Sequence, residues 1–152
     1  MSKLILITNP GSASRKYALY DGEELLAQLH FEYVGKKVVC TLKDAKGNKL
    51  GTVLFSSPYS DNVKGFNGPT PLLIALDAEG RIKNVVLLEN QETPNFAQHV
   101  VEGGLFEAWN GLTVDEALGK EVDAVSGATY TSNGVKKSLK ARLEAYQRQL
   151  KK

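Results

Sequence analysis

Hydroxyl-bearing and glycine residues crowd into the stretch from Asp123 to Val135, which reads DAVSGATYTSNGV. Gly127 allows the backbone to approach a ligand closely, and Ala128 keeps the next side chain small. A helix that starts here would present unpaired N–H groups and the positive end of its dipole, which suits a phosphate. The same residues also suit an elaborate helix cap, so both interpretations stay open at this point. The hydroxyls that could donate to phosphate oxygens are those of Ser126, Thr129, Thr131 and Ser132.

A long amphipathic helix must position this stretch. The sequence predicts that the helix begins near Ser132, whose hydroxyl is a good N-cap. Apolar residues then recur three or four positions apart, which places them on one face of a helix. This predicted apolar stripe consists of Val135, Leu139, Leu143, Tyr146 and Leu150.

Short apolar runs separated by turn residues predict antiparallel strands before that helix. Turn signals include Asp21-Gly22, DAKGN and DAEGR, each with a glycine where a left-handed residue is needed. Helical pieces are expected from about Asn95, over 105–109, and after Thr113, which has Glu116 at capping-box spacing. The predicted strands cover residues 4–8, 16–20, 25–33, 37–42, 51–57, 71–76 and 82–88. The fold class is therefore α+β: an antiparallel β-sheet with hairpins, flanked by helices that include a long C-terminal helix.

The composition is that of an ordinary globular domain, with 152 residues, 42% of them hydrophobic and 24% charged. The single cysteine, Cys40, excludes an internal disulfide framework and a multi-cysteine metal site, and it is expected to be a buried strand residue. No metal site is predicted. No stretch reaches the roughly 18 apolar residues of a membrane span, and the N-terminus does not read as a signal peptide. As written, the chain is expected to be cytoplasmic.

Charge is distributed unevenly along the chain. The net charge is +2 for residues 1–47, −6 for residues 48–132 and +6 for residues 133–152. No aromatic stacking platform accompanies the basic tail, so a nucleic-acid partner is not expected. The basic residues are interpreted as a solvated helix face.

The segment Asp123-Ala-Val-Ser126-Gly127-Ala128-Thr129 resembles the flavinylation motif D-x-x-[ST]-G-A-[ST] of the FMN-binding domain family. That family includes the C and G subunits of the sodium-pumping NADH:quinone oxidoreductase and of the Rnf complex. The resemblance implies that an FMN transferase joins the phosphate of FMN to Thr129. A threonine hydroxyl needs a base to act as a nucleophile, and the sequence offers only Asp123 nearby. Activation by the transferase and its metal is therefore expected.

Two further stretches carry the resemblance, in the order the family has them. They are GFNGPTPLLIALDAEGRIKNVVLLENQETP and SGATYTSNGV, so that about residues 50–150 are covered. By resemblance, Glu92, Thr93 and the Gly65–Pro69 loop with Gly68 line the isoalloxazine. The family commonly has glycine after E-T-P, whereas Asn95 stands here. The other predicted cofactor-binding residues are Asp123, Ser126, Gly127, Ala128, Thr131 and Ser132.

The resemblance implies an electron-transfer domain that carries FMN, rather than a stand-alone enzyme. The implied partners are an FMN transferase and a redox protein or membrane electron-transfer complex, and the chain has no membrane span of its own. If a leader peptide has been removed from the chain, the resemblance implies that the domain is located on the extracytoplasmic face of the membrane.

The first 47 residues resemble the N-terminal segment of acetate and butyrate kinases, whose signature is N-x-G-S-[ST]-[ST]-x-K. The other kinase elements have no room in this chain, so kinase activity is not expected. Residues 1–47 are interpreted as a β-meander segment and residues 48–152 as the FMN-binding domain, with a seam near residues 47–51. The matching residues are Asn9, Gly11, Ser12, Ser14 and Lys16, while Ala13 replaces a hydroxyl residue.

Two alternatives to a flavin domain stay open on the sequence alone. One is a phosphate-binding or phosphotransfer remnant built on residues 9–16, and the other is a partner-binding module with an empty site. Three single residues have plain structural interpretations. His99 is expected to be a surface or partly buried helix residue. Trp109 could stack on a flavin, but such a residue is more often a core aromatic. Glu92 is far from other acids in the sequence, which gives no support to a carboxylate-pair hydrolase.

Overall fold

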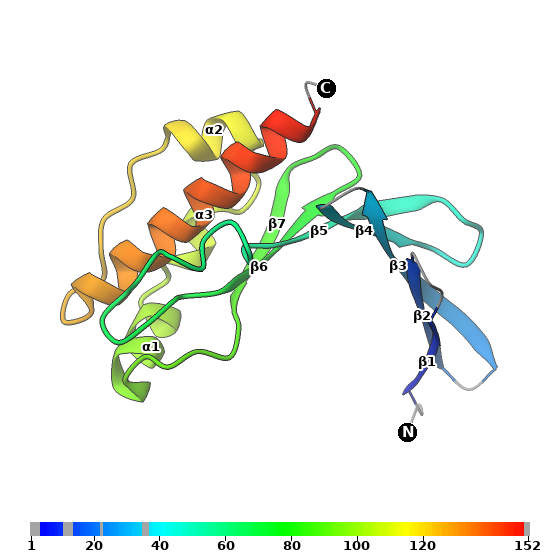
Figure 1. Cartoon of the computed structure of the whole chain (residues 1–152), viewed down its shortest axis with the longest axis horizontal. Helices are drawn as coiled ribbons and strands as arrows, with labels where there is room; N and C mark the ends of the chain where they lie inside the picture. The colour runs from blue at the N-terminus through cyan, green and yellow to red at the C-terminus, as the bar shows by residue number, and fades with distance from the viewer. Residues whose placement is uncertain (1–3, 11–13, 22, 35–36, 151–152) are drawn as a thin grey trace. The chain divides into compact units, whose positions relative to one another are not determined.

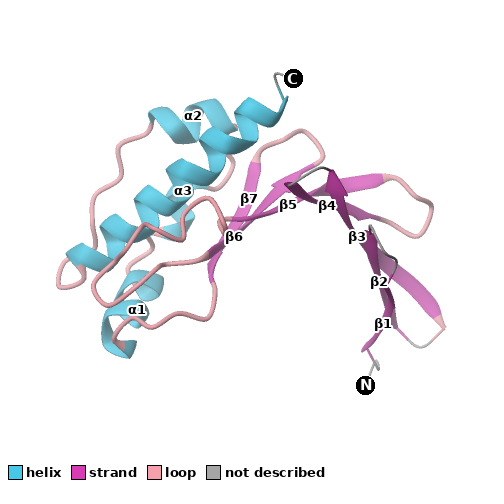
Figure 2. Cartoon of the chain, in the orientation of Figure 1, coloured by secondary structure: helices cyan, strands magenta, loops and turns pink. Residues whose placement is uncertain are grey.

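The structure is a computed structural model that describes residues 4–10, 14–21, 23–34 and 37–150. The chain divides into two compact units, which are treated separately below. The first contains Met1–Val53 and Leu76–Gly80, and the second contains Leu54–Ala75 and Arg81–Lys152. Figure 1 follows the chain from its N-terminus to its C-terminus, and Figure 2 shows its helices and strands.

The first unit is built from antiparallel strands. These are β1 (Leu4–Pro10), β2 (Ser14–Asp21), β3 (Glu24–Val34) and β4 (Lys37–Lys43), followed by β5 (Lys49–Phe55). Each of these strands pairs antiparallel with the next. The DAKGN turn closes as its sequence predicts: Asp44 Oδ1 accepts the N–H groups of Lys46 and Asn48, each at 2.9 Å, and Gly47 has a φ of 83°.

Cys40 is buried in β4, as expected, and burial raises the pKa of its thiol to about 11. The kinase-like residues Gly11, Ser12 and Ala13 lie outside the described residues. Of Asn9, Ser14 and Lys16 only the backbone is described, in β1 and β2. The hypothesis of a phosphate site there stays a prediction.

The second unit holds the helices and continues the strand series. Its elements include most of β6 (Leu72–Asp77), whose last two residues belong to the first unit, and β7 (Ile82–Leu87). They also include α1 (Pro94–Glu102), a 3-10 helix (Phe106–Trp109), α2 (Val114–Gly119) and α3 (Thr129–Leu150). Hydrogen-bonded neighbours follow the sequence order from β1 to β7. The predicted α+β class, with its antiparallel strands and long C-terminal helix, is confirmed, and every predicted strand is found within two residues of its expected bounds.

The hydrophobic core of the second unit follows the two periodicities that the sequence predicts. Along β6 buried residues alternate with partly exposed ones. From the helices come buried residues at helical spacing, including Trp109, which is 2% exposed. The core residues from the helical part include Val100, Phe106, Trp109, Val114, Ala117, Val135, Leu139 and Leu143.

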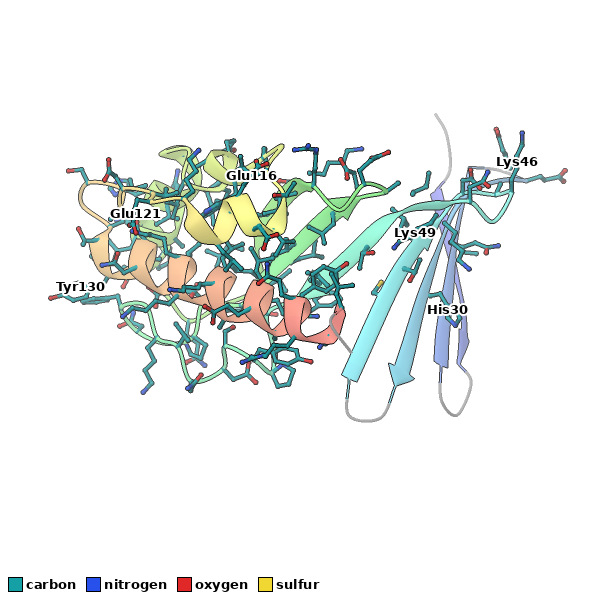
Figure 3. The ribbon with its side chains drawn as sticks, turned by 90° about the horizontal axis from the view of Figure 1, so that it is seen from above. His30, Lys46, Lys49, Glu116, Glu121 and Tyr130 are labelled. Carbon is teal, nitrogen blue, oxygen red and sulfur yellow. The ribbon has the colours of Figure 1, made fainter. Side chains whose placement is uncertain are left out.

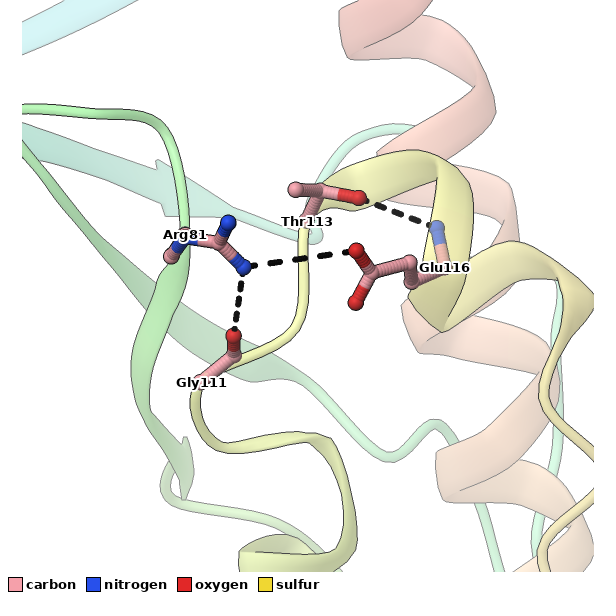
Figure 4. Close-up of polar contacts among 4 residues, drawn as sticks. All are labelled: Arg81, Gly111, Thr113 and Glu116. Carbon is pink, nitrogen blue, oxygen red and sulfur yellow. Dashed lines mark hydrogen bonds and ion pairs between the residues drawn. The ribbon is translucent and has the colours of Figure 1, made fainter.

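Helix α2 is fixed at its start by a side-chain cap and by a short backbone ladder. Thr113 Oγ1 accepts the N–H of Glu116 at 3.2 Å, which confirms the predicted cap (Figure 4). Arg81 donates to the carbonyl of Gly111 at 3.1 Å and approaches Glu116 at 4.0 Å. That ion pair is about half exposed and contributes little to stability. The backbone hydrogen bonds between Ile82 and residues 111–112 therefore contribute most to the position of α2.

The prediction for the start of α3 is wrong by three residues. The helix begins at Thr129, because the N–H of Ser132 already donates to the carbonyl of Ala128 at 2.9 Å. Ser132 is not the N-cap but a buried residue of the first turn. Its hydroxyl accepts the N–H of Val125 at 3.0 Å and so closes the preceding loop.

The predicted apolar stripe of α3 is confirmed for its first part. Val135, Leu139 and Leu143 are buried, and Tyr146 is half-buried. Leu150 is 66% exposed, so the stripe loses its cover before the helix ends. Within the described residues, no helix has both the length and the apolar character needed to cross a bilayer.

Candidate functional site

A tight turn delivers the chain into α3 and leaves Thr129 on the surface. The N–H of Ala128 donates to the carbonyl of Val125 at 3.0 Å, and Gly127 between them has a φ of 82°. That left-handed conformation favours glycine over any residue with a Cβ. Thr129 is the first residue of the helix, and its side chain is exposed. The backbone N–H groups of this first turn have no partner within the helix.

The four hydroxyls of the loop separate into an outer pair and an inner pair. Ser126 and Thr129 are exposed, whereas Thr131 and Ser132 are 1% and 0% exposed. Thr131 donates to Glu92, and Ser132 accepts from the backbone of the preceding loop. Only the outer pair is therefore placed to meet a group that arrives from solvent.

Three aromatic side chains stand around the exposed turn. Phe66 and Phe96 meet edge to face with ring centroids 5.1 Å apart, and the Phe66 ring lies 6.1 Å from that of Tyr130. Together with residues 127–131 they line an open, mainly apolar pocket of about 190 Å³. Phe66 is 53% exposed and Tyr130 is 70% exposed. Figure 3 shows Tyr130 at the N-terminal end of α3. Exposed aromatic residues gathered at one place are typical of a binding surface.

Glu92 connects the two walls of this pocket from inside. Its carboxylate accepts the backbone N–H groups of Phe66, Asn67 and Gly68 at 2.9, 2.8 and 3.0 Å. It also accepts the hydroxyl of Thr131 on α3. We call these four hydrogen bonds the Glu92 clasp. The clasp ties the loop that carries Phe66 to the helical turn that carries Thr129.

The clasp requires the ionised form of Glu92. Burial raises the pKa of this carboxyl, but the hydrogen bonds from Thr131 and from the three backbone N–H groups outweigh burial and hold the pKa below its ordinary value. The carboxylate also sits at the first turn of α3, where the helix dipole favours a negative charge.

Two glycines allow the loop and the helix to come this close. A Cβ on Gly134 would lie 2.6 Å from the Cα of Gly65, so the two backbones are in direct contact. A Cβ on Gly65 would in turn lie 2.7 Å from Glu92 Oε2. One turn further along α3, the buried hydroxyls of Thr70 and Ser138 are 3.0 Å apart. The Phe66 loop is thus packed against α3 along several residues.

The structure brings some of the predicted site residues together and leaves others apart. Gly127, Ala128 and Thr129 line the pocket, and Ser126 stands next to them in the turn. Gly68 is in the clasp, and Thr93 Oγ1 accepts the side-chain amide of Asn67 at 3.0 Å. Asp123 is exposed, and no hydrogen bond joins it to Thr129 in the described part of the chain.

Sequence reasoning missed Phe96, Tyr130 and His99, whereas Phe66 belongs to the predicted Gly65–Pro69 loop. Phe66, Phe96 and Tyr130 form its walls, and their signal was present, since Phe66 and Tyr130 each adjoin a glycine-bearing motif. His99 is exposed on α1, as expected, but its Nδ1 lies 3.8 Å from where a Cβ on Gly127 would stand. Its imidazole is therefore beside the turn. Trp109 is a core residue and takes no part.

An exposed hydroxyl at a helix N-terminus, beside an open aromatic pocket, is typical of a domain that holds a phosphate-bearing aromatic cofactor. Residues 65–144, more than half of the chain, match the FMN-binding domain family. The chain belongs to that family, whose cofactor is FMN.

Two relatives extend the comparison. The chain is 28% identical to the G subunit of the ion-translocating oxidoreductase complex of Stutzerimonas stutzeri, over 87% of this chain and 61% of the relative. It is 31% identical to the G subunit of the proton-translocating ferredoxin:NAD(+) oxidoreductase complex of Clostridium ljungdahlii, over 65% of this chain and 55% of the relative. The first alignment covers more than residues 48–152 could supply, so it reaches into the first 47 residues.

The chain spans 55 to 61% of the length of these curated relatives. No solved structure matches it.

The residues of the site fit FMN. The three aromatic side chains offer an apolar wall for the isoalloxazine, and the first turn of α3 offers N–H groups for the phosphate. Gly127 leaves the approach to Thr129 open. Glu92 has its oxygens committed to the clasp, so it holds the Phe66 loop against α3.

Proposed function

We propose that this chain is an electron-transfer domain that carries FMN covalently, through a phosphoester between the FMN phosphate and Thr129 Oγ1. The observation that carries the proposal is the position of Thr129: it is exposed, at the first position of α3 and on the edge of the aromatic pocket. Thr131 and Ser132 have the same chemistry but are buried and hydrogen-bonded.

The dimensions of the pocket support a covalent link. Cavities that hold a small molecule without a bond measure about 300 to 1,000 Å³ and bury most of the ligand. The aromatic pocket is open and measures about 190 Å³, so it can cover only part of FMN. A bond to Thr129 would retain a cofactor that this pocket alone would hold weakly.

Each part of the chain has a separate task in this proposal. FMN, when bound, supplies the redox chemistry. The N–H groups at the start of α3 and the turn of Ser126, Gly127 and Ala128 surround the phosphate. Phe66, Phe96 and Tyr130 orient the ring and leave one side of it accessible to a redox partner, and the Glu92 clasp keeps these walls in place.

Attachment would form a bond between Thr129 Oγ1 and the FMN phosphorus while another P–O bond of the flavin donor breaks and its leaving group departs. The Thr129 hydroxyl would lose its proton in this step, so that the chain gains FMN minus one water. Within the described ranges Asp123 makes no hydrogen bond to Thr129, and His99 is beside the turn rather than bonded to the hydroxyl. We therefore assign the activation of Thr129 to an FMN transferase. The names of the two relatives further suggest that the domain works in a membrane-associated oxidoreductase complex.

The test is the intact mass of the chain after co-expression with an FMN transferase. We expect the wild type to gain the mass of FMN minus one water, and Thr129→Ala to gain nothing. Ser126→Ala is the matched control, because Ser126 is the other exposed hydroxyl of the turn, and this variant should still be modified.

Two results would contradict the covalent link. A mass gain in Thr129→Ala would move the bond to another hydroxyl. An unmodified wild type that keeps flavin fluorescence through desalting, and loses it on denaturation, would show a non-covalent FMN site.

A further inference from the structure

A second depression lies between α2 and α3, away from the aromatic pocket. It has a volume of about 200 Å³ and an apolar floor that includes Trp109, Ala117, Leu139 and Leu143. One side is formed by α3 and the other by the segment that follows α2, on which Figure 3 labels Glu121. We call this depression the lysine groove, because Lys120, Lys136, Lys137 and Lys140 line its rim.

Three of these lysines make no ion pair with any of the described residues. Lys137 and Lys140 are exposed and Lys136 is half-buried. In the described part of the chain, none of the three makes an ion pair or a hydrogen bond. Lys120 differs, because its Nζ donates to the carbonyl of Ala108 at 2.8 Å. The groove therefore gathers positive charge that the residues around it do not neutralise.

The segment that precedes α3 in the sequence has the opposite net charge. Residues 48–132 carry a net charge of −6, whereas residues 133–152 carry +6. Glu121 also stands on the rim. A broad anionic surface, such as a lipid bilayer or a nucleic acid, would meet this acidic body as well as the lysines. A compact acidic group would meet the lysines alone, so local charge complementarity favours it.

The volume of the groove further restricts the kind of molecule that can occupy it. About 200 Å³ is below the range of about 300 to 1,000 Å³ in which free small molecules are held. It is enough for an apolar side chain that belongs to a larger partner, whose remaining contacts lie outside the groove. Buried apolar anchors with charged groups at the rim are the usual arrangement of a protein interface.

We propose that the lysine groove docks an acidic segment of a partner protein, with one apolar side chain on the floor and flanking carboxylates on Lys136, Lys137 and Lys140. This inference does not depend on the attachment of FMN. If the proposed function is also correct, the docked segment lies along the same helix as the cofactor. At about 1.5 Å per residue, Lys136 and Lys140 are roughly 10 to 17 Å from Thr129 along the axis of α3.

The test uses NMR of the full, FMN-free chain labelled with ¹⁵N and titrated with an acetylated Glu-Glu-Phe-Glu-Glu peptide. We expect amide shifts at residues 117–122 and 136–143, with little change at residues 65–68. A Glu-Glu-Ser-Glu-Glu peptide of equal charge lacks the apolar anchor and should shift these amides much less. Raising the salt from 0.05 to 0.5 M should weaken binding, because the charges are exposed.

The matched variants separate local charge from total charge. Lys137→Glu with Lys140→Glu should reduce the shifts at a fixed peptide concentration by about fivefold or more, since both attractive contacts become repulsive. Lys83→Glu with Lys64→Glu changes the net charge equally at exposed positions outside the groove and should keep most of the binding. Far-ultraviolet circular dichroism confirms that both double variants are folded.

Each alternative outcome overturns the proposal. Equal shifts with the phenylalanine and serine peptides would show that charge alone attracts the peptide and that no side chain binds the apolar floor. Undiminished binding by the Lys137/Lys140 variant would place the peptide elsewhere. Stronger shifts of the same amides with phosphatidylglycerol vesicles than with the peptide would assign the lysines to a membrane, and saturating shifts with inorganic phosphate would assign them to a small anion.

Discussion

The Glu92 clasp makes a quantitative prediction, because one carboxylate accepts four hydrogen bonds. In Glu92→Ala all four donors lose their acceptor. The N–H groups of Phe66 and Asn67 belong to exposed residues and can turn to water, whereas Gly68 and Thr131 are buried. Each buried donor left without a partner costs about 1–3 kcal/mol, so we expect the free energy of unfolding to fall by about 3–4 kcal/mol.

Glu92→Gln tests the contribution of the carboxylate charge to the clasp, because glutamine has nearly the same size and shape as glutamate. The amide keeps one acceptor oxygen for Asn67 and Gly68, but it presents N–H donors where Oε2 now accepts Phe66 and Thr131. The Thr131 hydroxyl can rotate to accept, whereas the backbone N–H cannot. About one charged hydrogen bond is lost, and we expect the free energy of unfolding to fall by about 2 kcal/mol.

The clasp also predicts the sign of the pH dependence. The pKa of Glu92 is lower in the folded chain than its ordinary value. Its stabilising contribution is therefore complete above the ordinary glutamate pKa of about 4.3, and it disappears as the pH falls through the lower, folded-state value. Wild type and Glu92→Gln should differ clearly at pH 7 and converge at acidic pH.

Urea unfolding followed by tryptophan fluorescence reports these changes from the second unit, because Trp109 is the single tryptophan and is buried there. Glu89→Ala is the control, since Glu89 is an exposed acid three residues away. A loss below about 1 kcal/mol in Glu92→Ala would refute the assigned role, because it would match an ordinary surface substitution. So would a difference between wild type and Glu92→Gln that persists unchanged at acidic pH.

Two further predictions concern backbone contact and burial. Gly134→Ala should destabilise the second unit by about 1–3 kcal/mol in the same urea assay, although alanine is the better helix former, because its Cβ would meet the Gly65 backbone at 2.6 Å; an unchanged or raised midpoint would contradict that contact. Cys40, with a pKa of about 11 and no exposed surface, should stay unmodified by Ellman's reagent at pH 8 until the chain is unfolded in urea. Rapid modification of the folded chain would contradict its burial.

The strands were predictable because their signal is local. Alternating apolar residues and glycine-bearing turns fix a hairpin within about ten residues, and the observed strand bounds lie within two residues of those expected. The role of Glu92 was not predictable in this way. Its partners are 24 to 39 residues away in the sequence, and three of them are backbone groups, which have no side-chain identity to recognise.

Two of the three aromatic walls of the pocket, Phe96 and Tyr130, were missed for a related reason. Phe66, Phe96 and Tyr130 come from a loop, from α1 and from α3, and only the folded chain brings their rings together. Each of them alone is an ordinary aromatic residue. The motif residues around Thr129 and the Gly65–Pro69 loop could be recognised because each motif is contiguous. The sequence therefore located the proposed point of attachment and the loop that carries Phe66, but not the walls formed by Phe96 and Tyr130.

The assignment of inner and outer hydroxyls, however, could be made from the sequence. Residues of a helix are about 100° apart, so positions three and four before Val135 lie on its buried face. Those positions are Ser132 and Thr131, and both are buried. Thr129 is about 200° away from Thr131 and therefore faces outward. The apolar stripe can be extended backward from Val135 to Ser132 and Thr131, instead of ending at the predicted N-cap. This extension would have placed the start of the helix before Thr131, and Thr129 on its exposed side.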